Sequence, residues 1–262
     1  MRELVVVANW KMHTTLAEAR ALASAVREGC RGLAGIRVVL CPPFTALAAV
    51  AETLQGSALT LGAQDVHWAE SGAFTGAVSP RQVADAGARL VILGHSERRQ
   101  VFGETDDVVQ QKVAAVLAQG LTPLVCVGET AAERAAGRTA EVVARQLEGA
   151  LAGRSGAEIA RCWIAYEPVW AIGSGQTATP AQAAEVHGAL RELVRALTTG
   201  AVAARCPILY GGSVKAASAG ALLAEPDVDG GLVGGASLNA AEFIGIVRAG
   251  LTAKGRAGLS TR

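Results

Sequence analysis

The sequence has little that would direct it to nucleic acid or to a membrane. Its 24 basic and 23 acidic residues leave a net charge of +1, with no basic stripe of the kind that binds nucleic acid. Apolar residues are plentiful, but they never run for the ~18 or more that a membrane helix needs. The segment 1–9 is short and ends in polar residues, which is typical of a first strand rather than of a signal peptide. We therefore expect a cytoplasmic protein that binds neither nucleic acid nor membrane.

Close pairs of cysteines are also missing. The cysteines are scattered singly, with no pair at metal-ligand or redox spacing. Their odd number and the lack of a secretion signal favour reduced thiols in a cytosol. Four of them lie in or beside apolar strand-like runs, where cysteine behaves as a small hydrophobic residue. We expect no metal site and no cofactor. The five are Cys30, Cys41, Cys126, Cys162 and Cys206.

Short apolar runs alternate with helical segments along the whole chain. They are apolar on both faces, as expected of parallel strands covered by helices. Thr179-Pro180-Ala181-Gln182 and Ser79-Pro80-Arg81-Gln82 each combine a helix cap, a proline at the first helical position and a capping-box partner. Eight strands alternating with helices over about 250 residues predict a closed (β/α)8 barrel, one α/β domain over 1–262 with its core at about 4–251. The runs are Leu4–Ala8, Ile36–Cys41, Ala58–Gly62, Leu90–Leu93, Thr122–Val127, Cys162–Tyr166, Ile208–Tyr210 and Val228–Val233.

A doubly wound open sheet is the alternative architecture. It would require a Gly-x-Gly-x-x-Gly turn after the first strand, where this chain has Asn9-Trp10-Lys11-Met12-His13, so the barrel is preferred. In either architecture the ligand binds beyond the C-terminal ends of the strands. The residues that follow each run are therefore the candidate site residues. They are Asn9 and Lys11, Gln64, Gly94 to Glu97, Glu129, Glu167, Gly211 to Ser213, and Gly234 to Ser237.

Glu167 is the most informative of these candidates. It stands between the strand-like run 161–166 and a segment that begins with Pro168 and contains Gly173 and Gly175. A carboxylate at a strand end, followed by a loop that could close over it, is how a general base is held and then shielded from water. This junction indicates an enzyme.

Two glycine pairs follow the last two strands. Gly211-Gly212 precedes Ser213, and Gly234-Gly235 follows the eighth run. Backbone N–H groups at such turns bind anions, and phosphate commonly lies after the seventh and eighth strands of these barrels. Either pair alone could simply turn a tight corner. Two pairs on neighbouring strands favour a phosphate site.

Lys11 and His95 are the other candidates with chemical roles. Lys11 could neutralise a phosphate or a developing enolate, although an ordinary surface lysine is the alternative. His95 lies at a strand end and at a predicted helix start, where N–H groups favour electron density on the nearer ring nitrogen. The ring should then stay neutral and donate from its other nitrogen. Glu97 could pair with Lys11 or an arginine, and Glu129 is expected to support a loop.

One base, one neutral electrophile, one cation and a phosphate site suit proton abstraction next to a carbonyl, which gives an isomer. No Ser-His-Asp set, HExxH motif or clustered ligand set is present. Two alternatives remain open. One is a catalytically silent phosphate-binding barrel, and the other is a different sugar-phosphate isomerase.

The motifs of the chain resemble those of the triosephosphate isomerase family from Leu4 to about Leu251. The resemblance implies a TIM barrel that interconverts dihydroxyacetone phosphate and D-glyceraldehyde 3-phosphate in glycolysis and gluconeogenesis, without a cofactor or metal. The motifs that carry it are Asn9-Trp10-Lys11, Gly94-His95-Ser96-Glu97-Arg98-Arg99, Ala165-Tyr166-Glu167-Pro168-Val169-Trp170-Ala171-Ile172-Gly173, Tyr210-Gly211-Gly212-Ser213-Val214 and Gly231-Leu232-Val233-Gly234-Gly235-Ala236-Ser237-Leu238.

The resemblance also implies roles for individual residues. Glu167 would be the general base, His95 the electrophile and Lys11 the electrostatic stabiliser, with Ser96 and Glu97 in support. The chain departs from the usual pattern at Ser174, Gln176 and His13, where threonine, lysine and asparagine are more familiar. The substrate-binding residues implied are Asn9, Lys11, Gly173, Ser213, Gly234 and Gly235.

Residues 64–79 form a long connection with two aromatics, Trp68 and Phe74. Long loops in compact domains are usually functional, and large apolar side chains at a loop tip favour a partner surface. The resemblance implies that this loop, near Thr75, inserts into a second subunit and supports its site around Lys11 and His95. We therefore expect a homodimer.

Overall fold

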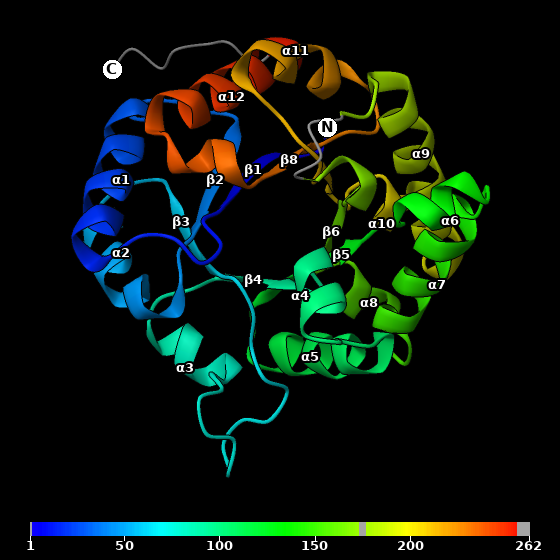
Figure 1. Ribbon diagram of the computed structural model, residues 1–262, viewed down its shortest axis with the longest axis horizontal. Coiled ribbons are helices and arrows are strands. Elements are labelled where there is room, and N and C mark those ends of the chain that lie inside the picture. Colours follow the sequence, from blue (N-terminus) through cyan, green and yellow to red (C-terminus); the bar gives the residue numbers. More distant parts are fainter. Residues whose placement is uncertain (1, 173–176, 256–262) are drawn as a thin grey trace.

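The computed structural model describes residues 2–172 and 177–255, and in it eight parallel strands close into a barrel (Figure 1). Each strand pairs with the next along the chain, and the last pairs back with the first. The predicted (β/α)8 barrel is confirmed, and the open sheet is wrong. All eight predicted strands are present, with their ends shifted by at most two residues. They are β1 (Leu4–Asn9), β2 (Ile36–Cys41), β3 (Thr60–Ala63), β4 (Leu90–Leu93), β5 (Thr122–Val127), β6 (Trp163–Tyr166), β7 (Ile208–Tyr210) and β8 (Gly230–Val233).

Helices surround the barrel and cover the outer face of its strands (Figure 1). The predicted capping boxes are present, since the hydroxyls of Ser79 and Thr179 accept hydrogen bonds from the N–H groups of Gln82 and Gln182. The α-helices are α1 (Leu16–Gly29), α2 (Leu47–Leu54), α3 (Pro80–Asp85), α4 (Ser96–Val101), α5 (Asp106–Ala118), α6 (Ala131–Ala135), α7 (Thr139–Leu151), α8 (Gly156–Ile159), α9 (Pro180–Leu197), α10 (Gly200–Ala203), α11 (Ala216–Ala224) and α12 (Ala240–Ala253). Three short 3₁₀ turns are η1 (Phe44–Ala46), η2 (Val169–Ala171) and η3 (Gly235–Leu238).

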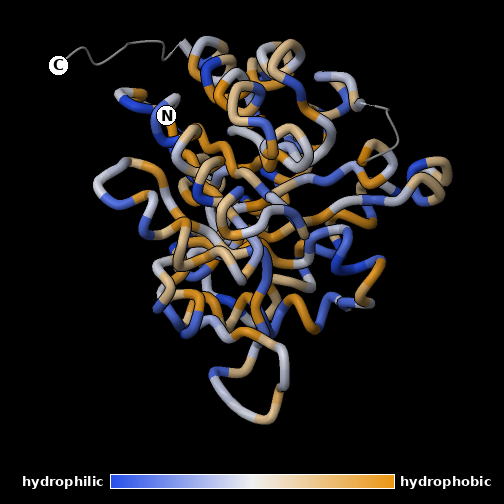
Figure 2. The backbone as a smooth tube through the Cα atoms, turned by 60° about the vertical axis from the view of Figure 1, so that its left-hand side comes forward, coloured by the Kyte–Doolittle hydropathy of each residue, from blue (hydrophilic) through white to orange (hydrophobic). Residues whose placement is uncertain are grey.

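The strands divide their side chains between two apolar regions. Val5, Val7 and Ile92 belong to a small cluster inside the barrel, whereas Val6 and Val91 pack outward with the helices. Hydropathy alternates along the surrounding helices, which therefore bury one face each (Figure 2). All five cysteines are buried and free, as predicted for small hydrophobic residues.

The loop between β3 and α3 extends away from the barrel (Figures 1 and 2). Within this loop the ring of His67 contacts those of Trp68 and Phe74, each at 4.0 Å between centroids. Within the described residues, no helix is long and apolar enough to cross a membrane. The same part of the chain holds no cluster of His, Cys, Asp and Glu suited to a metal ion.

Candidate active site

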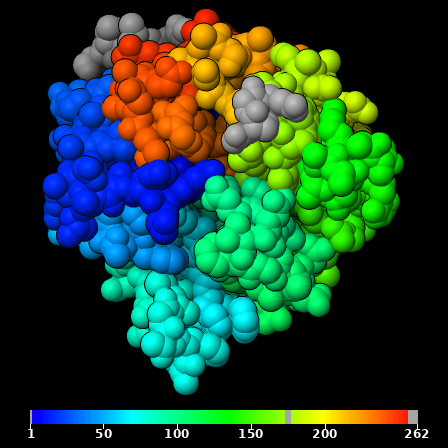
Figure 3. All heavy atoms as spheres, in the orientation of Figure 1, coloured from blue at the N-terminus to red at the C-terminus, as the bar shows by residue number. Residues whose placement is uncertain are grey.

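A cavity of about 950 Å³ opens at the C-terminal ends of the strands. Figure 3 shows the surface hollowed between the blue segment after β1, the teal segment of α4 and the orange segment of η3. The predicted site residues that border it are Asn9, Lys11, His95, Ser96, Glu97, Glu167, Gly211, Gly212, Ser213, Gly234 and Gly235. The structure therefore brings together residues that the sequence spreads over more than 200 positions.

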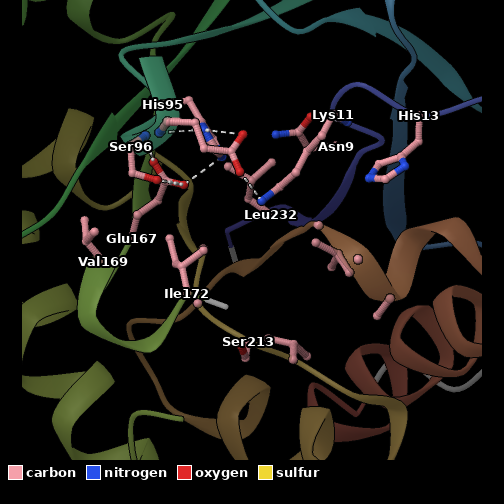
Figure 4. Close-up of a pocket in the computed structure, with 18 of the residues that line it drawn as sticks. Asn9, Lys11, His13, His95, Ser96, Glu167, Val169, Ile172, Ser213 and Leu232 are labelled. Carbon is pink, nitrogen blue, oxygen red and sulfur yellow. Dashed lines mark hydrogen bonds and ion pairs between the residues drawn. The ribbon is translucent and has the colours of Figure 1, made fainter. Parts of the chain in front are cut away.

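Glu167 follows β6 directly, and its carboxylate is 2% exposed. Its backbone N–H donates to the carbonyl of Val127 at 2.8 Å, which continues the pairing of β5 with β6 by one step. The carboxylate accepts from the N–H of Ser96 at 2.9 Å and from the Ser96 hydroxyl at 3.3 Å. Its Oε1 also lies 2.9 Å from Nε2 of His95 (Figure 4). The candidate base is thus held by two residues of the β4–α4 junction.

His95 is the N-cap residue of α4, and the helix determines which ring nitrogen donates. Its Nδ1 accepts a hydrogen bond from the N–H of Glu97 at 3.2 Å. The proton therefore sits on Nε2, which points to Glu167. This arrangement agrees with the prediction that the helix start occupies the nearer nitrogen and leaves the other free to donate.

The two side chains influence each other's protonation. Burial alone would raise the pKa of Glu167, but His95 and the Ser96 N–H outweigh it, so this pKa lies below its ordinary value. Burial alone would lower the pKa of His95, but the Glu167 carboxylate outweighs it and raises this pKa. The pair as described favours a charged carboxylate. A neutral imidazole stays a prediction for the reacting arrangement, in which Glu167 faces the substrate instead of His95.

Lys11 adopts a backbone conformation that is rare for a residue with a side chain, with φ of 51°. Two side chains stabilise it: its N–H donates to Asn9 Oδ1 at 3.0 Å, and its carbonyl accepts from Gln64 Nε2 at 2.8 Å. Its ammonium lies 2.5 Å from Glu97 Oε1. The open question on Glu97 is thus answered, because its close partner is Lys11.

On the opposite side of the cavity, Gly211 and Gly212 lie too close to other groups for a larger residue, whereas the space at Gly234 is limited only by the flexible Lys11 side chain. A Cβ on Gly212 would lie 2.3 Å from the hydroxyl of Tyr210, and one on Gly234 would lie 3.1 Å from Cε of Lys11. The Ser213 hydroxyl donates to the carbonyl of Ala171 in η2 at 2.9 Å, which ties the loop after β7 to the segment after Glu167. The predicted residues Gly173, Ser174 and Gln176 lie outside the described residues.

Glu129 is fully buried and connects the segment after β6 to its surroundings. One oxygen, Oε1, accepts from the hydroxyl of Tyr166 at 3.1 Å, from the indole of Trp170 at 2.9 Å and from Arg134 at 3.1 Å. Because Trp170 lies in η2, this carboxylate supports the start of the segment that follows the base. The prediction that Glu129 supports a loop is confirmed.

Sequence reasoning missed one polar residue near the base. Gln146 of α7 is 7% exposed, and its carboxamide bonds both backbone groups of Gly128, next to Glu167. The only signal was a glutamine at a buried helix position otherwise occupied by apolar residues such as Val143, Leu147 and Ala150. Of the other histidines, His13 lines the cavity rim, whereas His67 and His187 lie away from it.

Comparison with known proteins agrees with this geometry. The family model described as triosephosphate isomerase matches residues 4–250. The triosephosphate isomerase of Pelobacter propionicus is 51% identical over 247 residues, 94% of this chain and 98% of its own length. That of Thiobacillus denitrificans is 52% identical over 249 residues, with 95% and 99% covered. That of Moorella thermoacetica is 50% identical over 247 residues, with 94% and 98% covered. With the predicted barrel and site residues in place, the chain belongs to the triosephosphate isomerase family.

Proposed function

We propose that the protein interconverts dihydroxyacetone phosphate and D-glyceraldehyde 3-phosphate, a step of glycolysis and gluconeogenesis in the cytoplasm. The observation that carries the proposal is the meeting of Glu167 and His95 at 2.9 Å in a cavity that Lys11 also lines. Two glycine turns face them from the ends of β7 and β8. Membership of the family supports the same reaction.

The chemistry starts with Glu167. Its carboxylate leaves Ser96 and takes a proton from the carbon beside the substrate carbonyl. The C–H electron pair forms the new C=C bond, and the π pair of the carbonyl moves onto its oxygen. The Nε2–H of His95 and the ammonium of Lys11 stabilise the enediol(ate) that forms. Glu167 then returns the proton to the neighbouring carbon, while the proton of the adjacent hydroxyl moves to the former carbonyl oxygen. A positioned base contributes about 10²- to 10⁴-fold and one oxyanion donor about 10²- to 10³-fold, so both are needed.

The phosphate group binds at the other side of the cavity. Backbone N–H groups of Gly173, Ser213, Gly234 and Gly235 donate to its oxygens, and Asn9 helps to orient the substrate. The Lys11 side chain extends towards the glycine turn after β8, because a Cβ built on Gly234 would lie only 3.1 Å from the Lys11 Cε. The lysine can therefore serve the phosphate and the enediolate together. Neither a cofactor nor a metal is needed for this proton transfer.

A coupled assay tests the function directly. Purified protein is given dihydroxyacetone phosphate, and the aldehyde product is followed through a dehydrogenase that reduces NAD. Rapid conversion supports the proposal. Phosphate binding without turnover would instead indicate a silent barrel, and turnover of another sugar phosphate alone would indicate a different isomerase.

We further propose that two copies associate through the loop 64–79. Phe74 is 45% exposed and Trp68 is 38% exposed, whereas large apolar side chains of this kind are usually covered. Val101 and Phe102, at the end of α4, and Met12, next to Lys11, are also exposed. A second copy that covers them would support the segments that hold Lys11 and His95.

Phe74→Glu should therefore convert a dimer into a monomer and lower turnover strongly, because the site loses its support. Sedimentation velocity gives the mass, and the coupled assay at the same protein concentration gives the turnover. Arg138→Glu, on the exposed start of α7, is the matched charge-changing control and should remain dimeric and active. A wild-type protein that sediments as a fully active monomer would refute the proposal.

A further inference from the structure

The backbone pairing of β5 with β6 continues past the ends of both strands. At Gly128, however, the backbone N–H and carbonyl point away from the β6 side and need other partners. Val127 and Glu129 accept from the N–H groups of Glu167 and Val169 at 2.8 and 3.1 Å. Because backbone groups alternate in direction along a strand, the N–H and carbonyl of Gly128 point to the other side, towards β4. The strand β4 cannot meet them, since it ends at Leu93 and the chain turns away at Gly94, whose φ is 65°.

Gln146 takes the place of the missing strand. Its Oε1 accepts from the Gly128 N–H at 2.7 Å, and its Nε2 donates to the Gly128 carbonyl at 3.3 Å. A carboxamide carries the same donor and acceptor pair as a peptide group, so it can satisfy both backbone groups at once. The bonds are buried, and losing them would leave two backbone groups without partners, which is costly.

Gly128 in turn lies against the backbone of the base. A Cβ on Gly128 would be 1.7 Å from the carbonyl oxygen of Glu167 and 3.2 Å from its Cα. The main chain of Glu167 therefore rests directly on Gly128. A shift of Gly128 towards or away from β6 would move the origin of the Glu167 side chain.

A small cavity lies beside the contact between Gly128 and Glu167, so the Glu167 side chain has space into which it could move. A cavity of about 130 Å³ is lined by Gln146, Gly128, Ser96 and Glu167, so these groups surround one small void. Glu167 therefore borders unfilled space on one side. Its position depends on the Ser96 and His95 contacts and on the anchored main chain.

We propose that Gln146 is a positioning residue for the general base, acting through Gly128 and without touching the substrate. The proposal rests on the proposed isomerase function. The two hydrogen bonds from Gln146 fix the position of Gly128. Because Gly128 contacts the backbone of Glu167, this also fixes the position from which the carboxylate reaches the substrate carbon. A displacement of about 1 Å at a reacting group can lower the rate about 10²-fold.

Gln146→Met tests this, because it keeps the length of the side chain and removes both hydrogen bonds. We expect kcat to fall about 10- to 100-fold, with KM changed less than about threefold, since the phosphate site is untouched. The acidic limb of the kcat/KM profile should also move to higher pH. This follows because the Ser96 and His95 contacts that lower the pKa of Glu167 would be weakened.

Gln146→Asn covers the case in which the methionine variant does not fold. It keeps a neutral carboxamide but shortens the side chain by one methylene, so its bonds to Gly128 are weakened rather than removed and the loss in kcat should be smaller. Gln110→Met is the control, because Gln110 also donates to a backbone carbonyl, that of Ala152 at 3.0 Å, but away from the cavity. It should lower stability slightly and leave kcat and the pH profile unchanged.

The outcomes separate the two proposals. If the wild-type protein does not isomerise triose phosphates, the proposed function is wrong. If the wild type is active and both Gln146 variants fold with wild-type kcat and pH profile, then Gln146 only stabilises the fold and the positioning role is wrong. A fall in kcat with a displaced acidic limb in either folded variant supports it.

Discussion

Buried charges occur at both ends of the barrel, and the difference between them lies in how completely they are paired. At the N-terminal end, Arg191 of α9 is 5% exposed and contacts Asp227 and Asp229, each at 2.6 Å. It also donates to three backbone carbonyls. At the C-terminal end, Glu167, His95 and Lys11 border an open cavity and contact mainly each other and their neighbours.

The cluster of Arg191, Asp227 and Asp229 connects the elements that close the barrel. Asp229, just before β8, accepts from Arg2 ahead of β1 at 2.6 Å, from Arg191 of α9 at 2.6 Å and from the N–H of Ile208 in β7 at 3.0 Å. These contacts belong to the folded structure and do not need to change during a reaction. The charges at the other end border a cavity that a substrate could enter, so the proposed reaction can change their partners. The same residue types therefore serve structure at one end and chemistry at the other.

The largest expected effect comes from withdrawing the base. Glu167→Asp shortens the side chain by one methylene, so the carboxylate no longer reaches the substrate carbon, and turnover should fall about 10²- to 10⁴-fold. Substrate affinity should change little, because the phosphate site is intact. Steady-state kinetics in the coupled assay give both constants. An unchanged turnover number would remove Glu167 from the mechanism.

A change at the opposite end should act on stability instead. Arg191→Met leaves Asp229 buried with one partner fewer, and the free energy of unfolding should fall by about 3–5 kcal/mol. Kinetics of the folded protein should stay close to wild type, which urea unfolding and the coupled assay can show together. Arg195→Met is the control, since Arg195 is exposed and pairs with Glu192 at the surface. A stable but slow Arg191→Met variant would break the proposed division between the two ends.

The smallest effect concerns pH. His187 of α9 is fully buried, and burial lowers its pKa to about 4 from an ordinary 6.5. The unfolded chain binds this proton more readily, so the histidine's contribution is complete above pH 6.5 and is lost as the pH falls towards 4. The loss should be about 2 kcal/mol by pH 5 and about 3 kcal/mol in total.

His187→Leu should remove this part of the pH dependence, which urea unfolding at pH 7 and pH 5 can measure at one protein concentration. The Asp227 carbonyl that His187 contacts also accepts from Arg191 at 3.0 Å, so the leucine leaves no carbonyl unpaired. Equal losses in the variant and the wild type would show that other groups cause the acid sensitivity.

The sequence predicted the fold well because its signals are local. Each strand is a short run that is apolar on both faces, and the polar or glycine residue that ends it marks the site edge of the barrel. Glu167, His95 and Lys11 were chosen as candidates for that reason, and the structure places all three at one cavity. The predicted strand boundaries differ from the observed ones by up to two residues. For example, the eighth strand was predicted to begin at Val228, but β8 begins at Gly230.

What sequence reasoning missed depends on contacts between distant segments. Gln146 of α7 contacts Gly128, which follows β5. Arg191 contacts Asp227 and Asp229, which lie 36 and 38 positions later in the sequence. No sequence motif predicts either contact. The positive φ of Lys11 was also hidden, since no glycine marks it. The Asn9 contact is local, but the side chain of Gln64 reaches the Lys11 carbonyl only once β2 has paired with both β1 and β3.

The closing pair of the barrel links activity to the completion of synthesis. Strand β1 pairs with β8, and the Ser237 hydroxyl donates to the carbonyl of Asn9 across 228 positions at 3.4 Å. A nascent chain that lacks residues 230–237 therefore leaves the edges of β1 and β7 unpaired and lacks the Gly234-Gly235 turn that borders the cavity. Translation must reach the eighth strand before any turnover begins, so even a short C-terminal truncation into β8 is expected to abolish catalysis.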